Sequence, residues 1–164
     1  MRKAIYPGTF DPPHLGHLDL IARGLNLVDE LVVAVAVNRE KQSLFTQDER
    51  VGLLETCTHG LKGVRVVAFT GLVVELLKRE GASFMLRGIR TFSDFEAELG
   101  MALTNRQLAR GYNAETLFVL PTLEYSHYSS RRVKEVAGFG GAVGEFLPAP
   151  IREAVEARLK LQRR

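Results

Sequence analysis

The sequence is short of cysteine and of long apolar runs. Cys57 is the single cysteine among 164 residues, which excludes an internal disulfide and a metal site built from cysteines. The longest apolar runs, residues 31–37 and 117–121, are far shorter than the roughly 20 residues that cross a bilayer. Residues 1–3 lead directly into a strand pattern rather than a secretion signal. We therefore expect a cytoplasmic protein with no membrane partner.

The chain also lacks repeats, low-complexity linkers and a strong excess of one charge. Its length suits one compact domain, and 46% hydrophobic with 25% charged residues is ordinary for a globular chain. We expect a single domain over residues 1–164, with a C-terminal helix from about residue 150 to 164 packed on it. The net charge of +3 favours anionic partners such as nucleotides, nucleic acid or acidic lipid, without choosing among them.

Apolar β-branched runs alternate with helical periodicity, which is typical of a parallel sheet covered by helices. Residues 31–37 are apolar throughout, as in a central strand buried on both faces. We predict an α/β domain: a doubly wound, Rossmann-like, five-stranded parallel sheet with helices on both faces. Its strands are expected at residues 3–6, 31–37, 64–69, 83–86 and 116–120.

Local signals mark where the helices between these strands begin and end. Thr46 and Glu49 form a capping box, Gly81 suits a C-terminal cap, and Ser93 is expected to open a long helix that ends at Gly111. Pro150 suits the first turn of the last helix. Helices are expected at residues 14–28, 47–59, 72–80, 93–111 and from 150 onward.

Ligands of such a sheet bind outside the carboxyl ends of the strands. After the first strand come Gly8, whose lack of a side chain permits close ligand approach, and then a helix start that offers free amides to an anion. His14 and His17 lie three residues apart in its first turn and face roughly the same side. Taken alone, each histidine could equally be a surface or core-edge residue bonded to backbone.

Two further polar segments follow predicted strands. Arg87 and Arg90, separated by Gly88 and Ile89, are expected to point two guanidinium groups into the same crevice, although a solvated loop would look similar. Ser130 lies near a helix start, and it could be no more than the N-cap of that helix. These segments and residues 8–17 are expected to meet at one edge of the sheet.

Residues 8–17, Gly-Thr-Phe-Asp-Pro-Pro-His-Leu-Gly-His, resemble the signature of the HxGH nucleotidylyltransferase superfamily, in which this turn and helix start bind ATP phosphates. Residues 128–135, Tyr-Ser-Ser-Arg-Arg-Val-Lys-Glu, are similar to its second signature, two serines and a threonine before a basic residue. Arg131 departs from that signature, so a fork of guanidinium donors would replace a hydroxyl contact with phosphate.

Within the superfamily, the chain most resembles the bacterial phosphopantetheine adenylyltransferase family, over nearly its whole length. The stretch Arg-Gly-Ile-Arg distinguishes this family from relatives with other acceptors. The resemblance implies transfer of AMP from ATP to 4′-phosphopantetheine, which yields 3′-dephospho-coenzyme A and pyrophosphate. The acceptor phosphate would attack in line, without a covalent enzyme intermediate. The matching segments are residues 4–12, 45–50, 86–90, 94–96 and 133–135.

The resemblance implies three catalytic residues. His17 would stabilise the α-phosphate, Lys41 would hold the acceptor, and Arg90 would face the departing pyrophosphate. The residues implied to bind ATP are Thr9, Phe10, His14, His17, Gly88, Ile89, Arg90, Glu98, Tyr125, Ser126, His127, Tyr128, Ser129, Ser130 and Arg131. The residues implied to bind the acceptor are Thr9, Lys41, Val73 and Arg87. Tyr125 could instead pack in the core.

The resemblance also implies partners. Mg²⁺ would arrive with the ATP phosphates, because the motifs offer few carboxylates, and Asp11 is expected to order its turn rather than bind metal. A homohexamer and feedback by coenzyme A are implied, with residues 139–147 as a contact surface. An adenylyltransferase for another acceptor, such as nicotinamide mononucleotide, would share the first motif. A non-catalytic nucleotide- or RNA-binding module, suggested by the basic pI, is a second and less favoured alternative, because no aromatic RNA-stacking motif is present.

Overall fold

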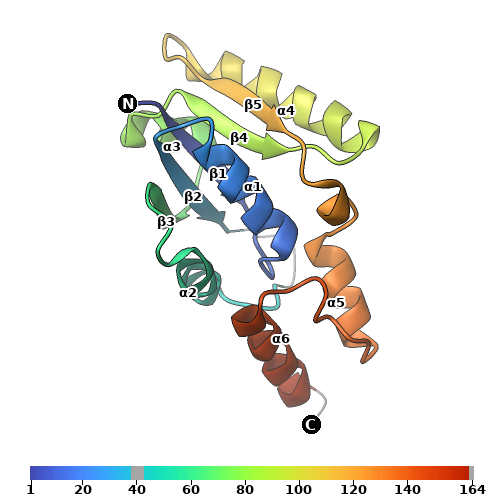
Figure 1. Cartoon of the computed structure of the whole chain (residues 1–164). Coiled ribbons are helices and arrows are strands. Elements are labelled where there is room, and N and C mark those ends of the chain that lie inside the picture. Colours follow the sequence, from blue (N-terminus) through green and yellow to red (C-terminus); the bar gives the residue numbers. More distant parts are fainter. Residues whose placement is uncertain (38–42, 163–164) are drawn as a thin grey trace.

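A computed structural model describes residues 1–37 and 43–162, except for the side chains of residues 161 and 162. Its sheet has five parallel strands in the order β3-β2-β1-β4-β5 (Figure 1). The predicted fold class is confirmed, and the apolar second strand lies inside the sheet, although β1 takes the middle position. The strands are β1 (Lys3–Gly8), β2 (Glu30–Ala36), β3 (Val64–Phe69), β4 (Phe84–Gly88) and β5 (Glu115–Val119).

The helices follow the predicted signals closely. The Thr46–Glu49 capping box is present, and Gly81 ends its helix with a left-handed φ of 63°. Ser93 was the wrong start for the long helix, because the Thr91 hydroxyl accepts from the Asp94 amide and caps it instead. The helices are α1 (Leu15–Leu25), α2 (Gln47–Thr58), α3 (Val73–Glu80), α4 (Phe92–Ala109), α5 (Ser130–Gly138) and α6 (Ala149–Gln162), with a 3₁₀ turn η1 (Leu123–Tyr125).

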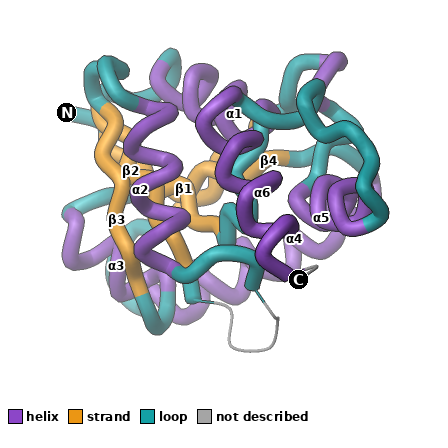
Figure 2. The backbone as a smooth tube through the Cα atoms, turned by 90° about the horizontal axis from the view of Figure 1, so that it is seen from below, coloured by secondary structure: helices purple, strands orange, loops and turns teal. Residues whose placement is uncertain are grey.

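Helices cover both faces of the sheet (Figure 2). Alternate residues of β2 point to opposite sides: Leu31, Val33 and Val35 pack with α1 and α2, whereas Val32 and Ala34 pack with α3 and α4. All five are fully buried. A strand buried on both faces needs no polar alternation, which explains the apolar run in the sequence.

A third apolar cluster joins α5 and α6 to α2 below the carboxyl ends of the strands (Figure 1). α6 forms this contact through a stripe at i, i+4 and i+8, which consists of Ile151 and Val155, both fully buried, and Leu159. Cys57 is half-buried at the margin of the cluster. None of the helices in the described ranges combines the length and apolar character that a membrane span requires.

The order of the strands places the functional edge. The chain leaves β1 for β2 on one side and later adds β4 on the other, so the carboxyl ends of β1 and β4 meet where the order reverses. This topological switch point is where ligands bind in doubly wound sheets.

Gly24 shows how tightly α1 packs on the sheet. A Cβ at Gly24 would lie 2.7 Å from Cδ1 of Leu86 and 3.1 Å from Cδ2 of Leu31. We expect Gly24→Ala to destabilise the fold by about 1–3 kcal/mol through overpacking. Gly100→Ala, in the interior of α4 with open space around its Cβ, is the matched control and should stabilise by about 0.5–1 kcal/mol. Urea denaturation of both variants tests this, and equal effects would contradict it.

Candidate active site

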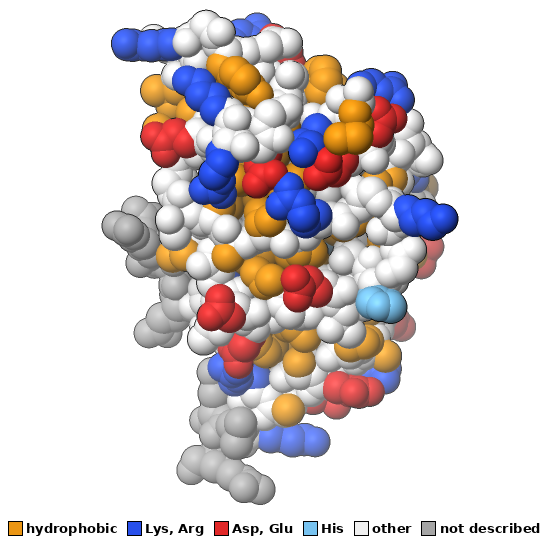
Figure 3. All heavy atoms as spheres, turned by 90° about the vertical axis from the view of Figure 1, so that its left-hand side faces the viewer, with side chains coloured by type: hydrophobic (Ala, Val, Ile, Leu, Met, Phe, Trp, Pro, Cys, Tyr) orange, Lys and Arg blue, Asp and Glu red, His pale blue; other side chains and the backbone are white. Residues whose placement is uncertain are grey.

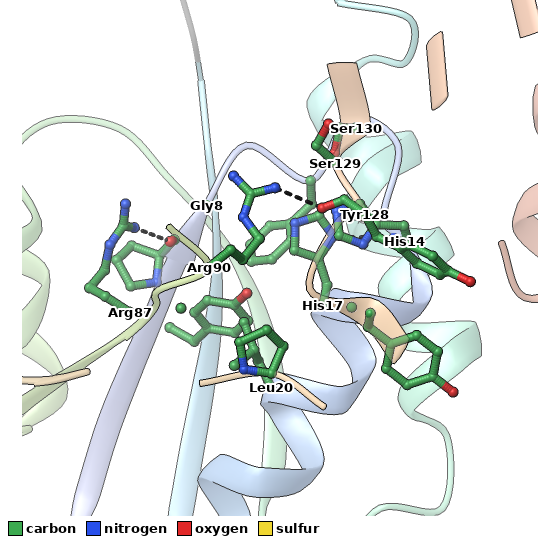
Figure 4. A pocket seen from close by; sticks show the side chains of 16 residues that line it. Gly8, His14, His17, Leu20, Arg87, Arg90, Tyr128, Ser129 and Ser130 are labelled. Atoms are coloured by element: carbon green, nitrogen blue, oxygen red, sulfur yellow. Dashed lines mark hydrogen bonds between the residues drawn. The ribbon is translucent and has the colours of Figure 1, made fainter. Parts of the chain in front are cut away.

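A cleft opens at the switch point, and we call it the main cleft (Figure 4). It brings together the turn after β1, the start of α1, the end of β4 and the start of α5. Six of the sequence-predicted site residues that line it are His14, His17, Arg87, Gly88, Arg90 and Tyr125. Phe10, Tyr128, Ser129 and Ser130 line it as well.

The two histidines at the start of α1 stack on each other, with ring centroids 3.6 Å apart. Nδ1 of His17 accepts a hydrogen bond of 3.1 Å from the backbone N–H of His14. Because Nδ1 is the acceptor, the neutral ring carries its proton on Nε2, which becomes the free donor. Nδ1 of His14 is buried and has no hydrogen-bond partner among the described residues. The pair is held for hydrogen bonding to an incoming group.

Burial governs the charge of both rings. It lowers the pKa of His14 to about 3, and the positive charge of Arg90 adds to the effect. Burial, followed by the charges of His14 and Arg90, lowers the pKa of His17 well below its usual value. Both imidazoles are therefore neutral donors at neutral pH.

The lowered pKa of His14 should make folding stability depend on pH. As pH falls below the ordinary value of 6.5, the unfolded chain binds a proton that the folded chain refuses until about pH 3. Stability is therefore lost as pH falls through this window, by about 1.4 kcal/mol per pH unit for this ring. Urea denaturation of wild type and His14→Asn between about pH 7 and about pH 4.5 measures it. Parallel pH profiles for the two proteins would contradict the assignment.

The glycines of the cleft are required by internal packing. A Cβ at Gly8 would meet the Phe10 ring at 2.8 Å, and one at Gly88 would meet Cδ1 of Leu20 at 2.3 Å. A Cβ at Gly16 would lie 3.1 Å from the His14 ring. Gly8, expected to permit close ligand approach, thus also lets Phe10 pack against the strand end, and Gly88 does the same for α1.

Arg87 stands between the main cleft and a second cavity. Its Nη1 donates to the Pro7 carbonyl at 2.7 Å (Figure 4), while Nε and Nη2 donate to Glu98 at 2.6 and 2.5 Å. The bonds to Glu98 keep the pKa of Arg87 above its ordinary value despite burial, which by itself would lower it. The second cavity is lined by Pro7, Val73, Met85, Arg87, Glu98, Met101, Ala102, Asn105 and Thr116.

This arrangement changes the expected neighbours of two residues. Glu98, expected beside ATP, lines the second cavity with Val73 and does not line the main cleft. Arg87 lies within β4 rather than after it, because pairing with β5 continues through Arg87 opposite Phe118. Val73, expected against the acceptor, shares a cavity with Arg87 as that expectation requires.

Arg90 ties β4 to the segment before α5. Its Nη1 donates to the Tyr128 carbonyl at 2.7 Å (Figure 4), and its Nε donates to Asp94 at 3.0 Å. The Tyr128 hydroxyl in turn donates to the Glu145 carbonyl at 2.9 Å. Arg90 is exposed at the mouth of the cleft, where part of its fork can turn to an anion.

The serines before α5 already have protein partners. Ser129, not Ser130, is the N-cap, because its hydroxyl accepts from the Arg132 amide. The Ser130 hydroxyl donates to the Pro12 carbonyl at 2.8 Å. Arg131 is exposed and lines a separate side hollow, together with Thr9, Asp11, Ser43, Ser130 and Lys134.

The remaining predicted residues lie at different depths. Ile89 is buried, and its amide donates to the Val119 carbonyl, so only its backbone faces the strand ends. Tyr125 is half-buried at the cleft and packs against Tyr128 with centroids 5.3 Å apart. Ser126 and His127 do not line the main cleft. Lys41 lies outside the described residues.

Three polar side chains hold the segments around the site, and of these only Asp11 was singled out from the sequence. Asp11 accepts from the amides of Leu44 and Phe45 at 2.9 and 3.0 Å and pairs with Lys134, so it orders the neighbouring segment as well as its own turn. Arg50 and Gln47 bind backbone carbonyls at the carboxyl ends of the strands. Gln47 and Arg50 lie three residues apart at the start of α2, the same spacing that places His14 and His17 on one side of the start of α1. This spacing is the signal in the sequence that could have identified them.

The chemistry of the cleft is that of a phosphate site. Two neutral imidazole donors, two guanidinium groups and the N-termini of α1 and α5 converge on it, and its lining among the described residues holds no carboxylate. Within the described part of the chain, no cluster of three or more histidine, cysteine, aspartate or glutamate side chains could hold a metal ion.

Comparison with known proteins identifies the class of nucleotidyltransferase. The cytidylyltransferase-like family model matches residues 5–136. Curated relatives agree over almost the whole length. Phosphopantetheine adenylyltransferase of Lachnoclostridium phytofermentans is 46% identical over 94% of both chains. The enzyme of that name from Synechococcus sp. strain WH7803 is 50% identical over 92% of this chain and 90% of its own.

The chain is therefore a cytidylyltransferase-like protein. Within that class it belongs to the phosphopantetheine adenylyltransferase family.

Solved structures agree on the fold. A candidate nicotinate-nucleotide adenylyltransferase from Vibrio parahaemolyticus matches with a TM-score of 0.68 at 16% identity, over 93% of this chain and 91% of its own. A lipopolysaccharide core biosynthesis protein from Thermoplasma volcanium matches with a TM-score of 0.54 at 26% identity, over 74% of this chain and 98% of its own.

Proposed function

We propose that this protein transfers AMP from ATP to 4′-phosphopantetheine and releases pyrophosphate, as the names of its relatives suggest. The observation that carries the proposal is a pair of adjoining cavities that share Pro7 and Arg87. One is lined by imidazole and guanidinium donors, and the other is partly apolar, with Val73 and Met101 in its wall. A nucleotide triphosphate suits the first, and a phosphate on an extended arm suits the second.

The reaction needs positioning rather than a protein nucleophile. An oxygen of the acceptor phosphate attacks the α-phosphorus in line, a new P–O bond forms, and the bond to the β-phosphate oxygen breaks. Nε2–H of His17 donates to the α-phosphate, where charge grows in the transition state. Arg90 faces the departing pyrophosphate, and Arg87 holds the acceptor phosphate at the wall between the cavities. Lys41 assists with the acceptor.

The other proposed contacts divide between the two sides. Thr9 touches both substrates. His14, Phe10 and the backbone of Gly88 and Ile89 support the nucleotide, together with Tyr125, Tyr128, Ser129, Ser130 and Arg131. Glu98 is proposed to act on the ATP side only indirectly, through its ion pair with Arg87.

Mg²⁺ is proposed to come with the ATP phosphates and to neutralise part of their charge. The lining of the main cleft fits this, because its described residues offer donors to phosphate oxygens and no carboxylate to hold the ion directly. Coenzyme A remains a proposed feedback ligand of the same two cavities.

The proposed partners are small metabolites in the cytoplasm, and nucleic acid is not among them. On the face drawn in Figure 3, acidic and basic side chains alternate and do not gather into one basic patch. The net charge is only +3. Tight, salt-dependent RNA binding requires a clustered basic surface.

We also propose that the chain assembles, as a homohexamer, through α4 and β5. Phe95, Leu99 and Leu103 form an exposed stripe at i, i+4 and i+8, and Phe118 of the edge strand β5 packs against Phe95. In the expected contact surface at residues 139–147, Phe139 is exposed, whereas Val143 and Leu147 are buried in the α5–α6 cluster, so this segment stays a second candidate for the contact. Exposed contiguous apolar surface of this kind marks a protein interface.

Leu103→Glu tests the assembly, since it places a charge on the most exposed residue of the stripe. Light scattering after gel filtration should give a multiple of the 18.2 kDa chain for wild type and a smaller mass for Leu103→Glu. Leu61→Glu, at a similarly exposed leucine on the α2–β3 connection, should leave the mass unchanged. A monomeric wild type would refute the assembly without touching the proposed reaction.

The reaction itself is tested by product identification. The protein, incubated with ATP, Mg²⁺ and 4′-phosphopantetheine, should yield equal amounts of pyrophosphate and dephospho-coenzyme A, identified by mass spectrometry. Omitting either substrate should abolish both products. Pyrophosphate released without the acceptor would instead indicate simple ATP hydrolysis to AMP.

A further inference from the structure

Arg50 is a buried cation that has no role in the reaction scheme proposed above. It lies in the second turn of α2, and only 3% of its surface is exposed. Its Nη1 donates to the carbonyl oxygens of Thr9 and Ala36, at 2.5 and 2.9 Å, and its Nε donates to the Thr46 carbonyl at 3.2 Å. One side chain thus joins the turn after β1, the end of β2 and the start of α2.

The turn that Arg50 holds is strained. Phe10, the residue after Thr9, has a φ of 50°, in the left-handed region that a bulky side chain disfavours. Its ring is fixed from the other side by edge contacts with Tyr6 and His17, at centroid distances of 5.3 and 4.9 Å. The carbonyl bonded by Arg50 directly precedes the strained residue. The guanidinium therefore opposes relaxation of the turn toward an extended conformation.

We propose that Arg50 is a positioning residue for the transfer reaction, which fixes Thr9 and, through Phe10, the orientation of His17. This inference rests on the proposed function, in which Thr9 touches both substrates and His17 touches the α-phosphate. A shift of the turn by about 1 Å is enough to lower turnover on the order of a hundredfold. Substrate affinity should change less, because most phosphate donors are held by other elements.

Arg50→Lys is the variant of choice, because an ammonium keeps the charge but lacks the planar fork from which Nε and Nη1 reach the three carbonyls at separate positions. We expect kcat to fall about ten- to a hundredfold, with the KM values for both substrates changed by less than about threefold. The matched control is Tyr112→Phe, which also removes a side-chain donor from two backbone carbonyls, those of Leu77 and Ala82, on the other face of the sheet. The control should lose melting temperature and keep kcat.

Chemical rescue separates positioning from general loss of structure. Added guanidinium ion, at millimolar concentration, should restore part of the turnover of Arg50→Ala, whereas equal sodium chloride or urea should not. If Arg50→Ala does not fold, Arg50→Lys alone decides the matter. Wild-type kcat in folded Arg50→Lys, or equal kcat losses in Arg50→Lys and Tyr112→Phe, would overturn the inference. Absence of product with wild-type protein would refute the proposed function instead.

Discussion

Replacing His17 with alanine is expected to lower kcat by on the order of 10² or more while the fold survives. The reason is the loss of one donor aimed at charge that appears only in the transition state. Nδ1 of His17 is occupied by the His14 amide, so Nε2–H is the donor that the cleft presents. Steady-state pyrophosphate release measures the loss. His59→Ala, which changes an exposed histidine outside both cavities, should keep full turnover.

Two conservative variants distinguish the roles of the two ring nitrogens. Asparagine at position 17 can accept from the His14 amide in place of Nδ1 but offers nothing at the position of Nε2. Glutamine extends an amide donor toward the position of Nε2 but leaves the His14 amide unpaired. We expect His17→Gln to retain more turnover than His17→Asn, and His17→Asn to be the more stable of the two. Wild-type turnover in His17→Ala would remove this side chain from the mechanism.

Replacing Arg87 with alanine is expected to raise the KM for 4′-phosphopantetheine on the order of a hundredfold and to change the KM for ATP much less. Two effects act together: the acceptor phosphate loses a guanidinium, and Glu98 is left as an unpaired negative charge in the second cavity. The double variant Arg87→Ala/Glu98→Ala should bind the acceptor better than Arg87→Ala alone, because the repelling carboxylate is gone.

Arg106→Ala is the matched control for Arg87, since it also breaks an arginine–carboxylate pair, with Glu115, but at the surface and outside both cavities. It should leave both KM values unchanged, as exposed ion pairs contribute little. Equal rises in both KM values for Arg87→Ala would contradict the assignment of Arg87 to the acceptor.

The sheet and its functional edge were predictable from the sequence because local patterns determine them. The apolar run at residues 31–37 could only be an inner strand, and the His14–His17 spacing could only place both rings on one side of a helix start. Gly81 and the Thr46–Glu49 box act within one helical turn. Such features need no knowledge of distant residues.

Features that depend on contacts between distant residues were not predictable in the same way. Glu98 shares a cavity with Val73 because Arg87, eleven positions earlier, holds it there. Gly8 and Gly88 are needed by Phe10 and Leu20, which no local pattern reveals. Arg50 reads as an ordinary helical arginine until the carbonyls of Thr9 and Ala36 are seen beside it. Ser129 rather than the expected Ser130 caps α5, because the Ser130 hydroxyl donates to the Pro12 carbonyl instead.

The choice of acceptor tests the account most directly. Pyrophosphate release should be measured with ATP and a panel of phosphorylated acceptors that includes 4′-phosphopantetheine and nicotinamide mononucleotide. The account predicts that kcat/KM for 4′-phosphopantetheine exceeds that for nicotinamide mononucleotide by on the order of 10³ or more, because only the former has an arm to fill the second cavity. Equal or greater efficiency with nicotinamide mononucleotide, or no turnover with 4′-phosphopantetheine, would contradict it.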